Sequence, residues 1–268
     1  MSIAPSDVLL TDRVAVVTGG GAGIGRGLAA GLTAFGARVA VWERNPETCA
    51  SAAAEIGALG ITTDVRDSAQ VDAALAQTVA ELGPVTILVN NAGGVFHSPI
   101  LETSENGWDA LYKANLRHVY LCTQRIARGI VERKQTGSIM SVTSIEGVRA
   151  APGYATYAAA KAGVINYTKT AALELAPHGI RVNALAPDLT MTEGIRAISP
   201  PGTDDRAKSM VPLGRAGHVD EMAGAAVFLA SDLSNYITGQ TIHVDGGTQA
   251  SSGWHHHPET GEYVLGAS

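Results

Sequence analysis

Cysteine and charge are both scarce in this sequence, and each shortage excludes a class of protein. Its 268 residues include two cysteines, Cys49 and Cys122, which are too few and too scattered for a disulfide framework or a zinc site. Charged residues make up 16%, and the net charge is -6. Nucleic acid and anionic membrane surfaces both require a basic face, so we expect neither as the main partner.

Long apolar runs are also missing. No stretch reaches the roughly 18 apolar residues that a membrane helix requires. Residues 1–10 lack the basic start and the apolar run of a secretory signal, so we expect a cytoplasmic protein. What the sequence does have is 46% hydrophobic residues, which is typical of a globular protein with a large core.

Short apolar strands alternate with longer helical stretches along most of the chain. Strands are expected at 13–19, 37–43, 61–65, 84–94, 137–144, 180–187 and 239–247. Helices are expected at 23–36, 45–57, 68–83, 106–134, 154–179 and 220–230. Because the strands are apolar on both faces and are separated by helices, the pattern predicts a parallel sheet that is covered on both sides.

The predicted fold class is therefore α/β, a single Rossmann-type doubly wound domain with a seven-stranded parallel sheet and helices on both faces. We expect this domain to span residues 1–248. Residues 190–212 are the least regular stretch and are expected to form a lid over the substrate. Residues 249–268 are expected to form a C-terminal tail.

A glycine-rich stretch, TGGGAGIG at residues 18–25, joins the first expected strand to the first expected helix. Glycines allow a tight turn, and the amide groups at a helix start can bind a pyrophosphate with help from the helix dipole. The spacing, Gly19-xxx-Gly23-x-Gly25, differs from the common G-x-G-x-x-G dinucleotide motif. A purely structural turn also explains such a loop, but its place after the first strand favours a dinucleotide site.

Glu43 stands at the end of the second expected strand, 18 residues beyond Gly25. In dinucleotide sites, an acidic residue at about this distance accepts hydrogen bonds from the adenosine ribose. Its charge would repel a 2′-phosphate, so we expect NAD as the cofactor and consider NADP disfavoured. Arg44 is the opposing signal, because a guanidinium could pair with that phosphate.

The stretch YATYAAAK, residues 154–161, holds two tyrosines and a lysine on an expected helix. Residues four apart share a helix face, so Tyr157 is placed against Lys161, whereas Tyr154 lies about 10 Å further along the axis. A free phenol has a pKa of about 10 and is a poor base at neutral pH. An ammonium about 4 Å away supplies on the order of 4 kcal/mol, enough to lower that pKa by about 3 units. We therefore predict that Tyr157 exchanges protons and that Tyr154 is a wall of the substrate pocket.

Two further polar residues support this chemistry, since the Tyr-x-x-x-Lys pattern alone also arises on helices by chance. Ser144 ends the fifth expected strand, at the edge where parallel sheets place their active groups, and its hydroxyl could hold a substrate oxygen. Asn115 is a poor helix former inside an expected helix, and we expect it to hold a water.

Together, these motifs resemble those of the short-chain dehydrogenase/reductase family over residues 10–248. The matching segments are TGGGAGIG (18–25), NNAG (90–93), YAAAK (157–161), RVNALAP (181–187) and VDGG (244–247). The resemblance implies that Tyr157 is the general acid/base and that Lys161 lowers its pKa and binds the nicotinamide ribose. It also implies that Ser144 polarises the substrate carbonyl or alcohol and that Asn115 completes a proton relay through water.

The resemblance further implies a cofactor-binding set, no metal requirement, and assembly as a homotetramer or a dimer. The cofactor-binding residues would be Gly19, Gly23, Ile24, Gly25, Glu43, Asp64, Val65, Asn91, Ala92, Gly93, Tyr157, Lys161, Pro187 and Thr192. From the neighbouring motifs, we expect the substrate to be lined by Val95, Phe96, Glu146, Arg149, Tyr154 and Asp188.

Two features depart from the family pattern. The family usually has Pro-Gly where this chain has Pro187-Asp188, and Asp188 either alters the nicotinamide pocket or points to solvent. The chain also continues beyond VDGG with a tail that includes His255–His257. Adjacent histidines rarely converge on one ion, so we expect no metal there. The tail either packs on a neighbouring subunit through Trp254 and Tyr263 or stays loose.

The sequence thus predicts an NAD-dependent oxidoreductase that interconverts a secondary alcohol and a ketone by hydride transfer. One alternative is an NADPH-dependent 3-oxoacyl thioester reductase, which shares every motif. Glu43 and the lack of a basic residue at Ala22 count against it. The other alternative is a dinucleotide-binding regulator without catalysis, which would have no need for Ser144, Tyr157 and Lys161 together.

Overall fold

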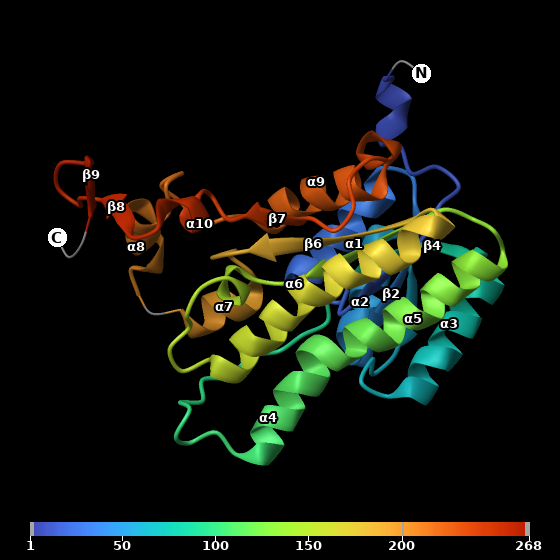
Figure 1. Cartoon of the computed structure of the whole chain (residues 1–268), viewed down its shortest axis with the longest axis horizontal. Coiled ribbons are helices and arrows are strands. Elements are labelled where there is room, and N and C mark those ends of the chain that lie inside the picture. The colour runs from blue at the N-terminus through green and yellow to red at the C-terminus, as the bar shows by residue number, and fades with distance from the viewer. Residues whose placement is uncertain (1–2, 200, 266–268) are drawn as a thin grey trace.

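A parallel sheet with helices on both faces organises the chain (Figure 1). The computed structural model describes residues 3–199 and 201–265. Seven strands form the sheet in the order β3-β2-β1-β4-β5-β6-β7, and all neighbours pair in parallel, which confirms the predicted fold class. The strands are β1 (Val14–Thr18), β2 (Arg38–Glu43), β3 (Leu59–Thr62), β4 (Val85–Asn90), β5 (Gly137–Val142), β6 (Ile180–Pro187) and β7 (Thr241–Val244).

Capping residues mark the ends of several helices. At α2, for example, the Asn45 side chain accepts hydrogen bonds from two backbone amides, and Gly57 ends the helix with φ +68°. None of the helices in the described chain is both long and apolar enough to cross a membrane. The helices are α1 (Gly23–Ala34), α2 (Pro46–Ile56), α3 (Ser68–Leu82), α4 (Glu105–Tyr112), α5 (His118–Glu132), α6 (Ala155–Leu175), α7 (Glu193–Ile198), α8 (Thr203–Met210), α9 (Val219–Ala230) and α10 (Thr248–Ser251), with short 3-10 turns at Pro5–Val8, Ile145–Gly147, Ala176–His178 and Asp232–Ser234.

The core is divided by the sheet into two apolar layers. Along β1, Ala15 and Val17 face one layer while Val14 and Val16 face the other, because successive strand residues point to opposite faces. Helices α1 and α9 cover the first layer, and α3, α5 and α6 contribute to the second. Burial on both faces explains why these strands read as continuous apolar runs.

The helical region expected at 106–134 is confirmed, but it contains a wider turn. Helix α4 continues directly through a π-helical segment, Lys113–Arg117, into α5. Such a segment inserts one extra residue into the helical ladder and is frequent at functional sites. It places Asn115, which is 1% exposed, toward the interior beneath the sheet edge.

The segment expected to be a lid is more regular than the sequence suggested. Within 190–212, α7 and α8 are both helical, and residue 200 between them lies outside the described residues. Thr192 explains the start of α7, since its side chain accepts a hydrogen bond from the Ile195 amide at 3.1 Å. The glycines and prolines of this stretch gave no sign of its two short helices, and its role as a lid over the substrate stays a prediction.

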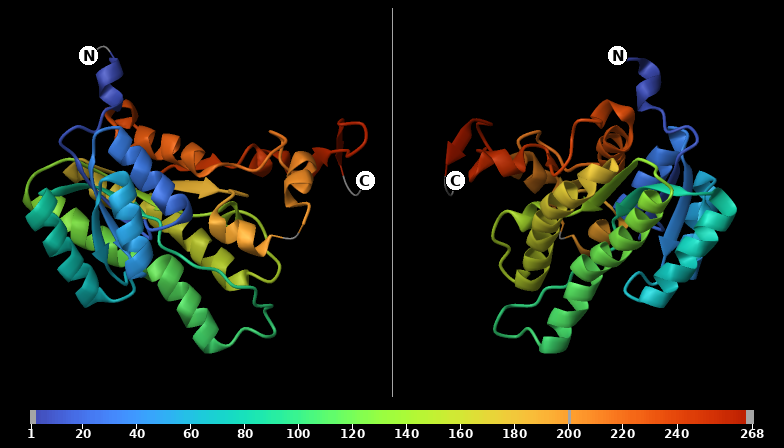
Figure 2. Two further views of the ribbon diagram at one scale, coloured as in Figure 1. Left: turned by 180° about the vertical axis from the view of Figure 1, so that it is seen from behind. Right: turned by 45° about the vertical axis from the view of Figure 1, so that its right-hand side comes forward.

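The C-terminal tail forms a small unit of its own and reaches away from the sheet (Figures 1 and 2). After α10, strands β8 (Trp254–His256) and β9 (Tyr263–Leu265) pair in antiparallel fashion. Residues 266–268 of the expected tail lie outside the described residues. The Trp254 and Tyr263 side chains are 48% and 54% exposed. Whether they contact a neighbouring subunit stays a prediction.

Candidate functional site

A cleft with a volume of about 650 Å³ opens at the carboxyl edge of the sheet. The strand order reverses beside β1, which lies between β2 and β4, and open α/β sheets bind ligands at such a point. A volume in this range fits a small-molecule or cofactor site. The predicted site residues that line the cleft are Gly19, Gly23, Ile24, Gly25, Glu43, Asp64, Val65, Asn91, Ala92, Gly93, Val95, Asn115, Ser144, Tyr157, Lys161, Pro187, Asp188 and Thr192.

The glycine loop is shaped so that side chains would block it. Gly19 has φ +62°, and a Cβ there would lie 2.9 Å from Cα of Ala92. A Cβ on Gly25 would overlap the carbonyl oxygen of Gly19. Helix α1 begins after Ala22, which offers no side-chain cap for the first amides of the helix. These amides border the cleft, so the loop fits the diphosphate of a dinucleotide.

The residues NNAG at the end of β4 are tied to the glycine loop. The amides of Asn91 and Ala92 both donate to Oγ1 of Thr18 at 3.0 Å. The Asn91 side chain donates to the carbonyl oxygens of Thr18 and Gly19, each at 3.1 Å. The two segments that the sequence places far apart therefore form one wall of the cleft.

Glu43 ends β2 and turns its carboxylate toward the glycine loop. Its oxygens accept hydrogen bonds from the Gly21 amide at 3.4 Å and from the Asn45 amide at 3.0 Å. Arg44 also lines the cleft but is exposed. At the same end, hydrogen bonds from Arg66 hold the pKa of Asp64 below its usual value. This end of the cleft thus has acceptors suited to ribose hydroxyls.

Tyr157 and Lys161 lie one turn apart on α6 and both line the cleft. The Lys161 ammonium is 5.5 Å from the centre of the Tyr157 ring, and its Nζ donates to the carbonyl oxygen of Val142 at 2.9 Å. Burial lowers the pKa of Lys161 to about 8. Burial also raises the pKa of Tyr157, which a hydrogen bond with Ser144 counteracts in part. The expected lowering of the phenol pKa by the ammonium is therefore not seen in this arrangement, because desolvation of the phenol dominates.

Ser144 and Asn115 border the same region of the cleft from two other elements. Ser144 Oγ accepts a hydrogen bond from the Glu146 amide at 3.2 Å and thereby starts the turn Ile145–Gly147. Asn115 Nδ2 donates to the carbonyl oxygens of Gly94 at 2.8 Å and Leu111 at 2.9 Å, and its Oδ1 accepts from the Gly94 amide at 3.3 Å. Asn115 thus holds the loop after β4, while its predicted water relay stays a prediction.

The predicted substrate residues are only partly brought together. Val95 and Asp188 line the cleft, whereas Glu146, Arg149, Tyr154 and Phe96 are absent from the lining that the described residues form. Tyr154 instead packs edge-to-face against the His97 ring at 5.4 Å. Of the two readings of Asp188, the structure supports the pocket, because its side chain is 17% exposed and pairs with Arg149 at 3.3 Å. Arg149 and Glu146 do not line the cleft, but Arg149 links Glu146 to Asp188, which does.

His118 does not line the cleft, but it is buried next to two residues that do, Ala92 and Lys161, and the sequence did not point to it. It is 1% exposed at the start of α5, and burial, with the nearby charge of Lys161, lowers its pKa to about 3. Its backbone partner is Ala92, and its Nδ1 is buried without a hydrogen-bond partner among the described residues. Its spacing of three residues from Asn115 was the available signal, since residues three apart share a helix face. Residues 3–199 and 201–265 hold no group of three or more His, Cys, Asp or Glu side chains placed to bind a metal ion.

Known proteins resemble this chain over the region that contains the residues of the cleft. The family model adh_short_C2, described as enoyl-(acyl carrier protein) reductase, matches residues 19–249. A 3-oxoacyl-[acyl-carrier-protein] reductase FabG of Chlamydia muridarum is 38% identical over 245 residues, which cover 89% of this chain and 98% of the relative. The FabG of Escherichia coli K12 is 39% identical over 240 residues, which cover 88% of this chain and 96% of the relative.

Solved structures of dehydrogenases also resemble this chain. A 7α-hydroxysteroid dehydrogenase in complex with NADH and 7-oxo glycochenodeoxycholic acid superposes with a TM-score of 0.88 at 27% identity, covering 92% of this chain and 98% of that one. A gluconate 5-dehydrogenase from Burkholderia cenocepacia in complex with NADP and tartrate superposes with a TM-score of 0.85 at 38% identity, covering 91% and 98%. The similarity in both cases extends over almost the whole length of the two chains.

Proposed function

The chain belongs to the short-chain dehydrogenase/reductase family, and on that premise we propose that it interconverts a secondary alcohol and a ketone with NAD. It is an NAD(P)-dependent oxidoreductase that acts on CH–OH groups. The regulator without catalysis is thereby set aside. The observation that carries the finer proposal is that Tyr157, Lys161 and Ser144 border one cleft with the glycine loop.

The proposed roles follow from where each side chain lies. When bound, the nicotinamide supplies or accepts the hydride. Ser144 Oγ holds the substrate oxygen, and the Tyr157 hydroxyl, which borders the same cleft close enough to Ser144 for that side chain to lower its pKa, exchanges a proton with that same oxygen. A neutral phenol is the form that donates to a ketone oxygen. Oxidation of an alcohol requires the phenolate, which the burial of Tyr157 disfavours because it raises the pKa of the phenol.

Two further residues have positioning roles in this proposal. Asn115 holds both backbone groups of Gly94, so it sets the course of the loop that borders the cleft after β4. Lys161 is itself oriented by the carbonyl oxygen of Val142. Both residues are at most 4% exposed, so their contacts are shielded from water.

The choice of NAD rests on the carboxylate of Glu43 at the end of β2. Its contact with the Gly21 amide supports a position next to the adenosine ribose, where a 2′-phosphate would be repelled. Arg44 is exposed beside it and is the one feature that would favour the phosphate. We propose NAD as the preferred cofactor, because the carboxylate of Glu43 contacts the glycine loop whereas the guanidinium of Arg44 is exposed.

A 3-oxoacyl thioester reductase is the second candidate. It is favoured by the FabG relatives, which are 38% and 39% identical to this chain. Glu43 counts against an NADPH-dependent reductase, because its carboxylate would repel the 2′-phosphate of NADPH. Kinetic comparison of the two cofactors and two substrate types separates the candidates.

The experiment follows reduced nicotinamide by its absorbance in both directions. The protein is assayed with NAD or NADP and a panel of secondary alcohols, and with NADH or NADPH and a short 3-oxoacyl thioester. We expect turnover of an alcohol with NAD to exceed all other combinations. Faster turnover of the thioester with NADPH would support the second candidate, and no turnover in any combination would contradict both.

Two expectations about the setting of the reaction belong to the same proposal. We propose a cytoplasmic enzyme, because Cys49 and Cys122 are both free thiols, as is usual in a reducing compartment. We also propose a homotetramer, with the exposed Trp254 and Tyr263 of the tail at a contact between subunits. Mass measurement in solution, with and without residues 249–268, tests the second point.

A further inference from the structure

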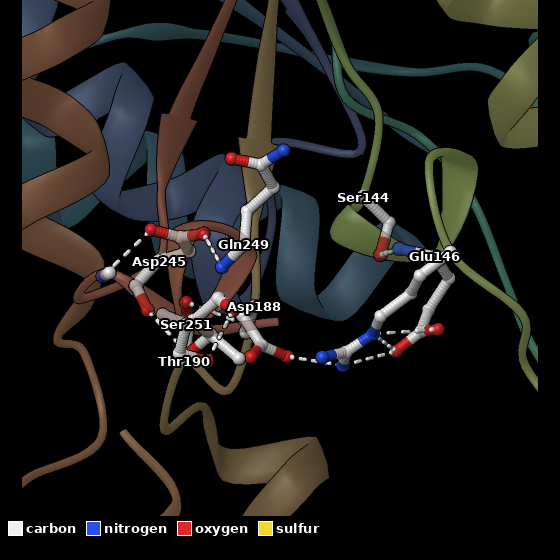
Figure 3. A network of polar contacts seen from close by, with 10 residues as sticks. Ser144, Glu146, Asp188, Thr190, Asp245, Gln249 and Ser251 are labelled. Atoms are coloured by element: carbon white, nitrogen blue, oxygen red, sulfur yellow. Dashed lines mark hydrogen bonds and ion pairs between the residues drawn. The ribbon is translucent and has the colours of Figure 1, made fainter. Parts of the chain in front are cut away.

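Arg149 bridges the carboxylates of Glu146 and Asp188, and Asp245 follows β7 on the other side of Asp188 (Figure 3). Arg149 Nη2 donates to Glu146 at 2.7 Å and to Asp188 at 3.3 Å. Its Nε donates to both oxygens of Glu146 at 3.3 Å. Asp245 stands close enough for its charge to raise the pKa of Asp188. We call these four residues the Arg149 cluster.

The Arg149 cluster is joined to the proposed reaction centre at two points. Asp188 follows Pro187 at the end of β6 and lines the cleft. Glu146 donates its backbone amide to Oγ of Ser144, which in the proposed function holds the substrate oxygen. Asp188 lines the same cleft as Ser144 and Tyr157. The cleft is a ligand site on independent grounds, namely its glycine loop and its place in the sheet.

The charge of the Arg149 cluster is negative. It contains three carboxylates and one guanidinium, so its formal charge is -2 when all four groups are ionised. The guanidinium is already shared between Glu146 and Asp188 and is therefore a poor partner for a substrate anion. The two carboxylates keep 24% and 17% of their side-chain surface exposed. An ionised carboxylate accepts several hydrogen bonds and donates none, so these groups are matched to hydroxyl donors.

From this arrangement we infer that the substrate is a neutral polyhydroxylated alcohol, and that a hydroxyl group beside its reacting carbon donates a hydrogen bond to Asp188, the carboxylate of the Arg149 cluster that lines the cleft. The inference rests on the proposed dehydrogenase function and adds the substrate class to it. A substrate with a carboxylate or phosphate at that position is repelled by the net charge of the cluster. An alcohol without further hydroxyls offers Asp188 no donor in place of the water that it displaces, so Arg149 remains the donor that this carboxylate keeps.

The test measures kcat/KM of the intact protein with NAD for three classes of substrate that have the same number of carbon atoms. These are a panel of hexitols, the aldonates with the same carbon chains, and hexan-2-ol. We expect the best hexitol to exceed its aldonate by about a hundredfold, because like charges in contact cost several kcal/mol. We expect hexan-2-ol to fall below the best hexitol by about tenfold or more.

Two sets of variants test the cluster itself. The double variant Asp188→Asn with Glu146→Gln keeps the side-chain shapes but removes both carboxylate partners of Arg149. We expect its ratio of aldonate to hexitol kcat/KM to rise by about tenfold or more, since the guanidinium can then bind the substrate anion. Glu132→Gln removes an exposed charge at the end of α5 and should leave this ratio unchanged.

The outcomes separate this inference from the proposed function. Equal kcat/KM values for hexitol and aldonate in the unmodified protein would overturn the inference. A double variant that loses thermal stability but keeps the original ratio would also overturn it, since the Arg149 cluster would then be only a structural clamp. Turnover of hexan-2-ol without a hexitol preference refutes the substrate class alone. Absence of turnover with every alcohol refutes the proposed function as well.

Discussion

The ammonium of Lys161 lies 5.5 Å from the centre of the Tyr157 ring and donates to the carbonyl oxygen of Val142. The same burial that shields this pair raises the pKa of Tyr157 and lowers the pKa of Lys161 to about 8. Both shifts favour the neutral forms of the two groups. As it stands, the site is therefore better prepared to donate a proton than to accept one.

This relationship predicts different pH dependences for the two directions of the reaction. Oxidation needs the phenolate of Tyr157, and because burial raises the pKa of this phenol above its usual value, kcat/KM for oxidation should still be rising between about pH 7 and pH 10. Reduction needs the phenol, which stays protonated over this range, so its kcat/KM should stay level there and fall only at higher pH. Initial rates of both directions in a series of buffers at one ionic strength measure this. Two flat profiles would mean that Tyr157 does not titrate with the reaction.

Replacing Glu43 should weaken the discrimination between the cofactors. In Glu43→Ala the carboxylate beside the glycine loop is gone and Arg44 remains, so a 2′-phosphate meets less repulsion. We expect the ratio of kcat/KM for NAD to that for NADP to fall by about tenfold or more. Glu81→Gln, an exposed position on α3, serves as the control and should keep the original ratio. An unchanged ratio in Glu43→Ala would place cofactor selection elsewhere.

Removing the Asn115 side chain should destabilise the protein. Asn115→Ala deletes its hydrogen bonds to Gly94 and Leu111 at a position that is 1% exposed. Loss of buried hydrogen bonds costs about 1–3 kcal/mol in the free energy of unfolding, which urea titration measures. The same substitution at the exposed Asn106 should cost less than about 0.5 kcal/mol. Equal effects at both positions would contradict the role given to Asn115.

His118 should make the protein sensitive to acid. Its pKa is about 3 in the folded protein, compared with 6.5 for the free side chain. At pH values between these two, the unfolded chain binds more protons than the folded chain. The contribution of His118 to stability therefore falls as the pH falls from 6.5. At pH 5 the loss is about 2 kcal/mol.

A comparison of two proteins isolates this contribution from that of other titrating groups. The free energy of unfolding is measured by urea titration at pH 7 and at pH 5 for the unmodified protein and for His118→Gln. The drop between the two pH values should be smaller in His118→Gln by about 2 kcal/mol. Parallel drops in the two proteins would show that His118 takes up no proton on unfolding.

Much of the fold and the chemistry could be read from short-range patterns. Alternating apolar strands and helices predicted the sheet, and a spacing of four residues on one helix placed Tyr157 beside Lys161. These patterns succeed because each depends on the geometry of a single element. The start of α1 at the glycine loop belongs to the same class of signal.

What could not be predicted depends on contacts between distant segments or on burial. Asp188 and Arg149 are 39 residues apart, and nothing local in the sequence pairs them. The hydrogen bond from Asn115 to Gly94 depends on a π-helical turn, which cannot be predicted from the spacing of apolar residues in the sequence. The pKa of Tyr157 was expected to be lowered by the positive charge of Lys161. It rises because the desolvation of the phenol, a property of the whole fold, is the larger effect.

The central claim is that the Tyr157 hydroxyl carries the proton in an NAD-linked reaction, and Tyr157→Phe tests it most directly. The measurement pairs kcat/KM for alcohol oxidation with the affinity for NAD, followed by protein fluorescence, and uses Tyr154→Phe as the matched control. We predict a fall in kcat/KM of about a thousandfold for Tyr157→Phe with NAD affinity retained, and near-normal turnover for Tyr154→Phe. Turnover of Tyr157→Phe within about tenfold of the unmodified protein would contradict the claim.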